Sequence, residues 1–493
     1  MDTSPSYAIG EPALRDLWID PASGDETAAG NERSRALRTI AAAWRKIPER
    51  CTGHGWRILL CPGRYTPDAD GHINLTGRHG TRECPILLQS ADAASPVQLP
   101  PLDVEHCSYV YVLDLKFVSS KIEHIPASTD NVVHFADCDH ILLRRVVASG
   151  DPAPPGLPRL AFKANQCSHL YVEDCEFSDS YAYVFAYVAV HYGHVVRSKF
   201  HRCRMAGICL KGGSAYHLVA GNEVSDANVM GIGIGEGAGF AFMVPPWIQY
   251  EAYGMKVVNN VVRDCGGGLA VSGGYDVLMA YNTCYRVGSS RDTVVVALGG
   301  HSWVKDPANA ARCERYHAQG GWCLPDGEEF IPNRNVQICN NLIFNPDGYE
   351  SQHAHFGISG PMSAKPNSNV PDPIGSTNLR IAGNVVWNGG YNKPVLDDVE
   401  NMYGLAARPT YSLEELRREN QLNTLRPELI NPGGGNFRPA PNGDLAGTAA
   451  VPLFDFPGDE KAPPVPAVEA DNSVPSDRDG KPRNRGTIGA YSL

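Results

Sequence analysis

Three side chains that can carry charge and move protons occupy equivalent places along the sequence: Lys163, His191 and Lys211. Each follows an alternating apolar stretch, written LAFKA, VAVHY and ICLKG. Because side chains alternate between the two faces of a strand, the apolar residues of these stretches face a core and the basic groups face outward. The pattern predicts one outer column of two ammonium groups and an imidazole, beside a strip of small residues.

This column suggests a particular chemistry. Neighbouring positive charges disfavour one another, so we expect Lys211 to titrate below the ordinary lysine value and to serve as a general base. Removal of a proton α to a carboxylate, with cations holding the developing enolate charge, is β-elimination of a uronate. We therefore predict that Lys211 and His191 are catalytic and that Lys163 binds the substrate carboxylate, with His191 also contacting it.

The positioning elements come from a repeat. Nine similar apolar segments recur, with shortest spacings of 22 to 24 residues and longer ones where loops are inserted. A period of this length predicts a solenoid of short strands, one coil per repeat. The equivalent positions are Leu115, Val146, Cys175, Ser198, Asn222, Asn260, Asn282, Asn341 and Asn384.

Residues in register on successive coils should stack at the strand separation of about 4.8 Å. The five asparagines then form a ladder in a turn, since a short amide side chain bonds the neighbouring backbone. Two residues further on, Phe117, Phe177 and Phe200 are expected to stack in the core. Cys107, Cys138 and Cys167 form another column, which we interpret as buried thiols rather than disulfides.

The ends of the chain have their own patterns. Leu37, Ile40, Ala41, Trp44 and Ile47 lie on one helical face, which suits a helix that covers the open end of a solenoid. We expect an N-terminal segment and capping helix over 1–50, a solenoid over 51–400 with insertions at 236–253 and 301–332, and a tail over 401–493 that packs along it.

Two segments resemble a known superfamily. LWIDPASGDETAAGN through GWRILLCPGRYTPD resembles the entry segment of secreted right-handed parallel β-helix proteins of the pectate-lyase-like superfamily, and DRDGKPRNRGTIGAY is similar to their closing segment. The resemblance implies an all-β fold, a single-stranded right-handed parallel β-helix with a helical cap and an irregular tail. It also implies a secreted or periplasmic location. The superfamily includes lyases, glycoside hydrolases, epimerases and non-enzymatic binders, so the site must decide the function.

Composition limits the classes of partner that the protein can bind. The net charge of −11 argues against broad nucleic-acid binding, and no apolar run is long enough to cross a bilayer. We expect a soluble monomer acting on an acidic polysaccharide or oligosaccharide. GICLKGGS also resembles the strand that carries the base lysine of family nine pectate lyases, which use calcium bound by an aspartate cluster. That cluster has no counterpart here, so calcium remains open and no metal site is assigned.

Aromatic residues and glutamates concentrate in the 236–253 insertion, EGAGFAFMVPPWIQYEAYG. Tyr250 can protonate a leaving oxygen and Trp247 can stack on a sugar, although a loop that simply packs on the solenoid is about as expected. Glu236 is a further substrate-binding residue, and it would enter the Lys211 column if the register slipped by one.

The 301–332 insertion and the segment before it supply the remaining candidates. Cys313 and Cys323 close a short loop and are the best disulfide pair, while Arg286, Arg291 and His301 could line the groove as substrate ligands. A glycoside hydrolase using two of Glu236, Glu251 and Asp264 is the first alternative function, and a non-catalytic glycan-binding β-helix is the second.

Overall fold

The computed structural model describes residues 5–119, 131–150, 159–302, 307–324, 327–349, 351, 353–389, 396–397, 411–457, 471–483 and 487–492. The chain divides into two compact units. The upstream unit contains Pro5–Ala186 and Val190–Cys203, and the downstream unit contains Tyr187–Ala189 and Arg204–Leu493. Among the described helices, none combines the length and hydropathy needed to span a membrane.

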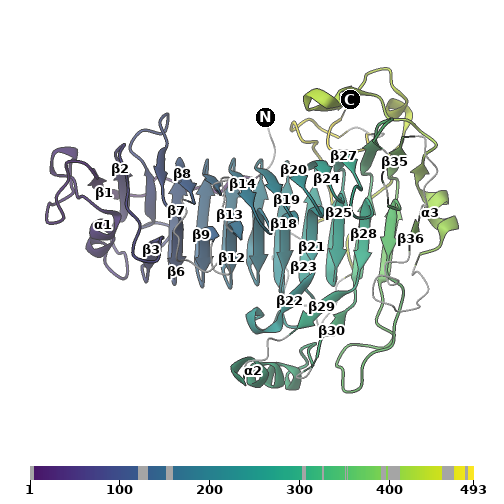
Figure 1. The fold of residues 1–493 in the computed structure, drawn as a ribbon, viewed down its shortest axis with the longest axis horizontal. Coiled ribbons are helices and arrows are strands. Elements are labelled where there is room, and N and C mark those ends of the chain that lie inside the picture. Colours follow the sequence, from purple (N-terminus) through teal and green to yellow (C-terminus); the bar gives the residue numbers. More distant parts are fainter. Residues whose placement is uncertain are drawn as a thin grey trace. The chain divides into compact units, whose positions relative to one another are not determined.

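The upstream unit is a parallel β-helix whose short strands form rungs of three sheets (Figure 1). Its predicted core columns are confirmed: Phe177 lies opposite Phe200, with ring centroids 5.5 Å apart, and Ala148 separates Phe117 from Phe177. The three sheets contain, in turn, β1 (Leu14–Ile19), β2 (Gly55–Leu60), β4 (Ile86–Ser90), β7 (Ser108–Leu113), β10 (Asp139–Arg144), β13 (Ser168–Glu173) and β16 (His191–Val196); β3 (Ile73–Thr76), β6 (Leu102–Glu105), β9 (Asn131–Ala136) and β12 (Leu160–Asn165), with β15 (Phe185–Val188) at the unit boundary; and β5 (Val97–Leu99), β8 (Leu115–Val118), β11 (Val147–Ser149), β14 (Glu176–Ser180) and β17 (Lys199–Cys203).

The thiol column and the cap agree with the sequence prediction. Cys107, Cys138 and Cys167 are buried free thiols, each donating to a backbone carbonyl. Helix α1 (Ile40–Lys46) begins after Thr39, whose hydroxyl accepts from the Ala42 backbone N–H. Of the predicted apolar face, Leu37, Ile40, Trp44 and Ile47 are buried, and Ala41 is partly exposed.

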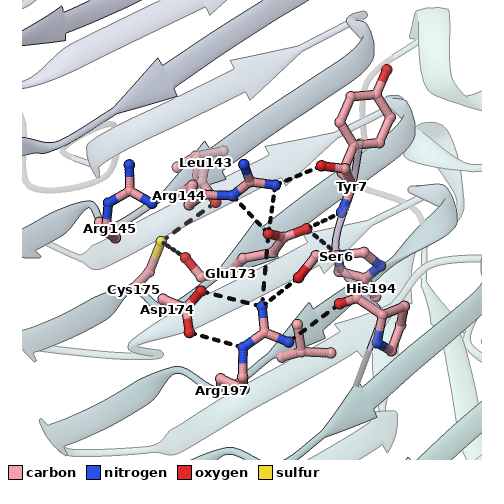
Figure 2. Close-up of polar contacts among 12 residues, drawn as sticks. Ser6, Tyr7, Leu143, Arg144, Arg145, Glu173, Asp174, Cys175, His194 and Arg197 are labelled. Atoms are coloured by element: carbon pink, nitrogen blue, oxygen red, sulfur yellow. Dashed lines mark hydrogen bonds and ion pairs between the residues drawn. The ribbon is translucent and has the colours of Figure 1, made fainter. Parts of the chain in front are cut away.

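The extended segment around Tyr7 is held against the β-helix by a buried carboxylate (Figure 2). Glu173 is fully buried at the end of β13, where its carboxylate accepts from the Tyr7 backbone N–H at 2.5 Å and from Arg144 at 2.8 Å. His194 Nε2 lies 2.8 Å away and Arg197 Nη2 3.7 Å away. These partners outweigh the burial that opposes ionisation and lower the pKa of Glu173 to about 2.

The downstream unit has the same three-sheet construction and the predicted asparagine ladder. Asn222, Asn260, Asn282, Asn341 and Asn384 are bonded amide to amide at 2.9 to 3.0 Å, and the ladder continues to Asn420. Its sheets contain β19 (Ser214–Ala220), β23 (Ala252–Val258), β26 (Gly274–Ala280), β31 (Arg334–Cys339) and β34 (Thr377–Ala382); β18 (Ala206–Lys211), β21 (Met230–Gly235), β25 (Leu269–Ser272), β28 (Val294–Ala297), β33 (Phe356–Ile358) and β36 (Leu396–Asp397); and β20 (Glu223–Ala227), β24 (Val261–Cys265), β27 (Thr283–Val287), β32 (Leu342–Asn345), β35 (Val385–Asn388) and β37 (Gln421–Leu422).

The insertions add structure to this unit. Strands β22 (Gly237–Gly239), β29 (Gly299–Ser302) and β30 (Glu329–Ile331) form a small sheet, and η2 (Phe240–Phe242) packs with helix α2 (Pro307–Ala318). The C-terminal region contains α3 (Leu413–Glu419) and the hairpin of β38 (Leu429–Asn431) and β39 (Asn436–Pro439). The predicted tail over 401–493 stays a prediction, and its residues 401–410, 458–470, 484–486 and 493 lie outside the described residues.

Candidate functional site

Lys211 ends strand β18, and the register of the downstream unit places it as predicted, on the outer face. Cys209 lies opposite Gly233, which lies opposite Ala270, so the strip of small residues exists in this unit. The alternating partners Ile208, Ile232 and Leu269 are buried in the core. The Lys211 side chain is 14% exposed.

The partner of Lys211 is a carboxylate. Lys211 Nζ lies 2.6 Å from Glu236 Oε2, and the Glu236 side chain is 42% exposed. The structure therefore places a carboxylate beside Lys211 where the sequence predicted neighbouring cations, and the predicted lowering of the Lys211 pKa stays a prediction. Burial, with a further contribution from the same carboxylate, raises the pKa of the Cys209 thiol well above its usual value, which keeps that thiol protonated.

A glycine turns Glu236 toward Lys211. Gly235, rather than Glu236, lies opposite Ser272, so the predicted register holds without a slip. Gly235 has a φ of +72°, and a Cβ there would come within 1.8 Å of the Ser272 carbonyl oxygen. Only glycine fits, and the turn that it permits directs the next side chain over the end of β18.

Glu236 lines a pocket of about 290 Å³. A second carboxylate, Glu328, lies directly before β30. A Cβ on Gly300 would meet Glu328 Oε1 at 2.8 Å, and Gly300 pairs with Gly237, the residue after Glu236. The described lining consists of Glu236, Gly237, Ser272, Ala297, Leu298, Gly299, Gly300, Glu328, Phe330, Ser359 and Met362. The pocket thus combines two carboxylates, two hydroxyls and one aromatic ring.

A larger hollow of about 780 Å³ lies beside α3 and residues 444–451. Its charged side chains are Asp444 and three residues of this short helix, where Arg418 pairs with Glu419 at 2.9 Å and is mostly exposed. We assign the candidate site to the smaller pocket, because its two charged groups come together from separate segments, Glu236 between β21 and β22 and Glu328 directly before β30.

Behind the pocket, Glu251 fastens the two turns that carry the ion pair. Its fully buried carboxylate accepts from the Gly212 backbone N–H at 3.0 Å and from the Ala238 N–H at 3.3 Å. Gly212 follows Lys211, and Ala238 is two residues after Glu236. His301 Nε2 lies 2.8 Å from Glu251 Oε1 without hydrogen-bond alignment, so this contact is electrostatic. The His301 Nδ1–H donates to the Trp322 carbonyl, which fixes the ring.

The predicted column of three basic groups is wrong. His191 begins β16 and pairs with Ser168, so it lies in the sheet of β10 and β13, not in the sheet of Lys163. The predicted strand over 188–192 ends at Val188 because Ala189 adopts a left-handed φ of 53° and turns the chain. Lys163 lies on β12 of the upstream unit, opposite His134 on β9.

The predicted aromatic ligands pack inward. Tyr250 and Trp247 are buried, and Tyr250 contacts Tyr275 and Trp322 with ring centroids 5.0 and 4.7 Å apart. Of the described residues that line the pocket, neither is a member, so the interpretation of a loop packing on the solenoid is supported. Among the aromatic residues of this insertion, Phe242 alone is exposed.

The other candidates also lie away from the pocket lining. Arg286 pairs with Asp264 at 3.1 Å on the sheet of β24 and β27, which removes Asp264 from the carboxylate alternatives. Arg291 lies in the turn before β28, and His301 acts behind the pocket through Glu251. Cys313 and Cys323 are free thiols, and Cys323 Sγ donates to the Cys313 carbonyl at 3.3 Å, so the predicted disulfide is wrong.

Glu328 was missed from the sequence. The signal was the adjacent pair Glu328–Glu329 before β30: strand alternation must bury one and expose the other, and Glu329 is fully buried while Glu328 is exposed.

Comparisons with known proteins found one matching family model and several similar solved structures. Residues 156–359 match the family model for a right handed beta helix region. No curated protein matches the chain in sequence. Similar solved structures include XylC in complex with xylose (9% identity, TM-score 0.47, 97% of this chain and 98% of that chain) and pectate lyase Pel9A (12% identity, TM-score 0.42, 92% and 96%). A mannuronic acid specific polysaccharide family 6 lyase from human gut microbiota is similar at 12% identity and a TM-score of 0.39, over 76% of this chain and 86% of that chain.

Proposed function

We propose that this right-handed parallel β-helix protein hydrolyses a glycosidic bond of a polysaccharide or oligosaccharide in the pocket beside Glu236. The observation that carries the proposal is the presence of two carboxylates, Glu236 and Glu328, in one pocket at the edge of a sheet. Glycoside hydrolysis uses such a pair, with one group acting as acid and the other as base or nucleophile.

The environments of the two carboxylates suggest their roles. Glu236 is 42% exposed and lies 2.6 Å from Lys211, so it suits the group that takes the proton of the attacking water. Glu328 then protonates the leaving glycosidic oxygen as the bond between that oxygen and the anomeric carbon breaks. The water oxygen bonds to the anomeric carbon, so one water is consumed and both protons are accounted for.

The rest of the pocket suits a sugar. Phe330 offers an aromatic face on which a pyranose ring can stack, and Ser272 and Ser359 offer hydroxyls for its hydroxyl groups. Among the described lining residues the charged groups are both acidic, which favours a neutral sugar in this subsite over a uronate.

β-Elimination of a uronate is the second candidate, favoured by the short Lys211–Glu236 contact. At 2.6 Å the ammonium proton can pass to Glu236 and leave a neutral amine able to remove an α proton. The acidic lining counts against it, because a uronate carboxylate would have to bind beside Glu236 and Glu328. Calcium, a secreted location and a monomeric state remain parts of this proposal.

Incubation with a panel of neutral and uronate-containing glycans tests both candidates. Hydrolysis releases reducing ends without ultraviolet-absorbing product, whereas elimination generates an unsaturated product that absorbs in the ultraviolet. We expect the first result. Binding of a glycan without either product would contradict an enzymatic role and support the glycan-binding alternative.

A further inference from the structure

Four polar side chains converge on the outer face of the upstream unit, whereas the pocket belongs to the downstream unit. Asp103 on β6 lies opposite His134 on β9, and Glu105 on β6 lies opposite Ala136. Asn165 on β12 lies opposite Ala136 from the other side. The small side chain of Ala136 therefore has Glu105 and Asn165 on its two flanks and His134 two residues before it on the same face.

His134 has oxygen atoms against both of its ring nitrogens. Nε2 lies 2.7 Å from Asn165 Oδ1, and Nδ1 lies 3.0 Å from Asp103 Oδ1. A neutral imidazole has one N–H, so its donation to Asn165 leaves the Nδ1 lone pair facing a carboxylate. Two acceptors at this distance repel each other unless a proton or a metal cation lies beside both.

We propose that Asp103, Glu105 and His134 bind a divalent transition metal ion, with zinc or manganese as the fitting class. One ligand atom from each of the three lies within 4.8 Å of the other two. Two ligands on bonds of about 2.1 Å at a right angle are about 3.0 Å apart, which matches the separation of Nδ1 from Asp103 Oδ1. A mixed set of imidazole and carboxylate donors suits these ions better than calcium or magnesium.

Asn165 completes the arrangement as a positioning residue. A histidine that binds a metal through one nitrogen commonly donates its other N–H to a fixed acceptor, which sets the tautomer and the ring orientation. Asn165 Oδ1 is that acceptor for Nε2, and Asn165 is itself buried. Lys163 lies opposite His134 on the next strand and is the nearest cationic side chain on this face by register, so it should weaken metal binding.

A second cluster in the same unit provides a matched comparison. Asp139, His140 and His169 also place ligand atoms within 4.8 Å of one another. There the two imidazole rings are stacked, with centroids 4.2 Å apart and planes 13° apart, and both Nδ1 atoms face Asp139. Lone pairs in parallel planes cannot point at one ion, so this cluster is better explained as two N–H groups donating to one carboxylate.

Calorimetric titration of the chelator-treated full chain with Zn²⁺, Mn²⁺ and Ca²⁺ tests the site. We expect saturable binding of one zinc or manganese ion, with a rise in the thermal midpoint on binding. His134→Gln and Asp103→Asn should abolish this binding, Asn165→Ala should weaken it by about tenfold or more, and Lys163→Met should tighten it.

The matched control is His169→Gln, which should leave binding and the midpoint shift unchanged. Circular dichroism of each variant checks that it has folded, and an unfolded His134→Gln leaves the Asp103→Asn and Lys163→Met results to decide. The proposal is overturned if the wild type binds no metal, if calcium alone binds, or if binding survives His134→Gln and is lost in His169→Gln. An ion pair between a protonated His134 and Asp103 would then explain the contact.

Discussion

Glu173 and Glu251 are both carboxylates with fully buried side chains, yet the two have very different surroundings. Glu173 faces two arginines, one histidine and one backbone N–H. Glu251 has two backbone N–H groups and one histidine. The first carboxylate has more than one positively charged partner and holds the segment around Tyr7, whereas the second has no arginine or lysine among these partners and lies beside a pocket. A buried carboxylate can thus stabilise the fold or position a site, and the charge of its partners distinguishes the two roles.

The largest expected effect on stability comes from breaking the Glu173 cluster. Glu173→Ala leaves Arg144 and His194 without their buried partner, and removing one member of such a network costs about 3 to 5 kcal/mol. Urea denaturation of the variant measures the loss in the free energy of unfolding. A loss below about 1 kcal/mol would show that the cluster is solvated rather than structural.

Glu173 should also make the free energy of unfolding depend on pH in the acid range. The folded pKa of Glu173 is about 2, below its ordinary value of 4.5, so folding favours the ionised form. Its contribution is complete above the unfolded value and is lost as the pH falls from about 5 toward 2. The difference in unfolding free energy between wild type and Glu173→Gln, followed over this range, should shrink with decreasing pH; a constant difference would contradict the assignment.

Glu251→Gln should have a smaller effect on stability and a clear effect on turnover. The Gly212 and Ala238 N–H groups bind different oxygens of the carboxylate, so the single oxygen of the amide can accept from only one of them. The substitution also removes the charge that faces His301, and we expect about 1 to 3 kcal/mol of destabilisation. Displacement of the two turns should lower kcat by about a hundredfold, since small misplacements at a site are costly. An unchanged kcat in a folded variant would reduce Glu251 to a structural role like that of Glu173.

The asparagine ladder offers an uncharged comparison within the downstream unit. Asn282→Ala removes amide bonds to Asn260 and Asn341 and leaves the Asn260 backbone N–H without its acceptor. The expected loss is about 1 to 3 kcal/mol in unfolding free energy, with turnover unchanged. Thermal denaturation and the hydrolysis assay together check it, and a fall in turnover would extend the site to this turn.

Sequence periodicity could predict the coils and their core columns, and the right-handed β-helix fold that the resemblance implied is confirmed. The ladder from Asn222 to Asn384 and the stacked Phe177 and Phe200 follow from strand alternation and a constant register. The Glu173 cluster was also predictable, because Arg144 and Arg197 lie 29 and 24 residues from it, which is one coil on each side.

The candidate site could be predicted only in part. Lys211 lies on the outer face as alternation requires. His191 lies on another sheet, because the left-handed Ala189 turns the chain within the segment 188–192 that was predicted to be one strand. The partner of Lys211 depends on the turn at Gly235, and Glu328 reaches the pocket through a long insertion. Neither the turn nor the insertion belongs to the repeat, so periodicity cannot predict where Glu236 and Glu328 lie.

Turnover by Glu236→Gln in the glycan assay tests the central claim most directly. Glu223→Gln is the matched control, since Glu223 is also a partly exposed glutamate in an ion pair, 2.9 Å from Arg263, but on another sheet. We predict that Glu236→Gln loses about a thousandfold in kcat or more while remaining folded, and that Glu223→Gln retains wild-type turnover. Wild-type turnover in Glu236→Gln, or an equal loss in both variants, would contradict the account.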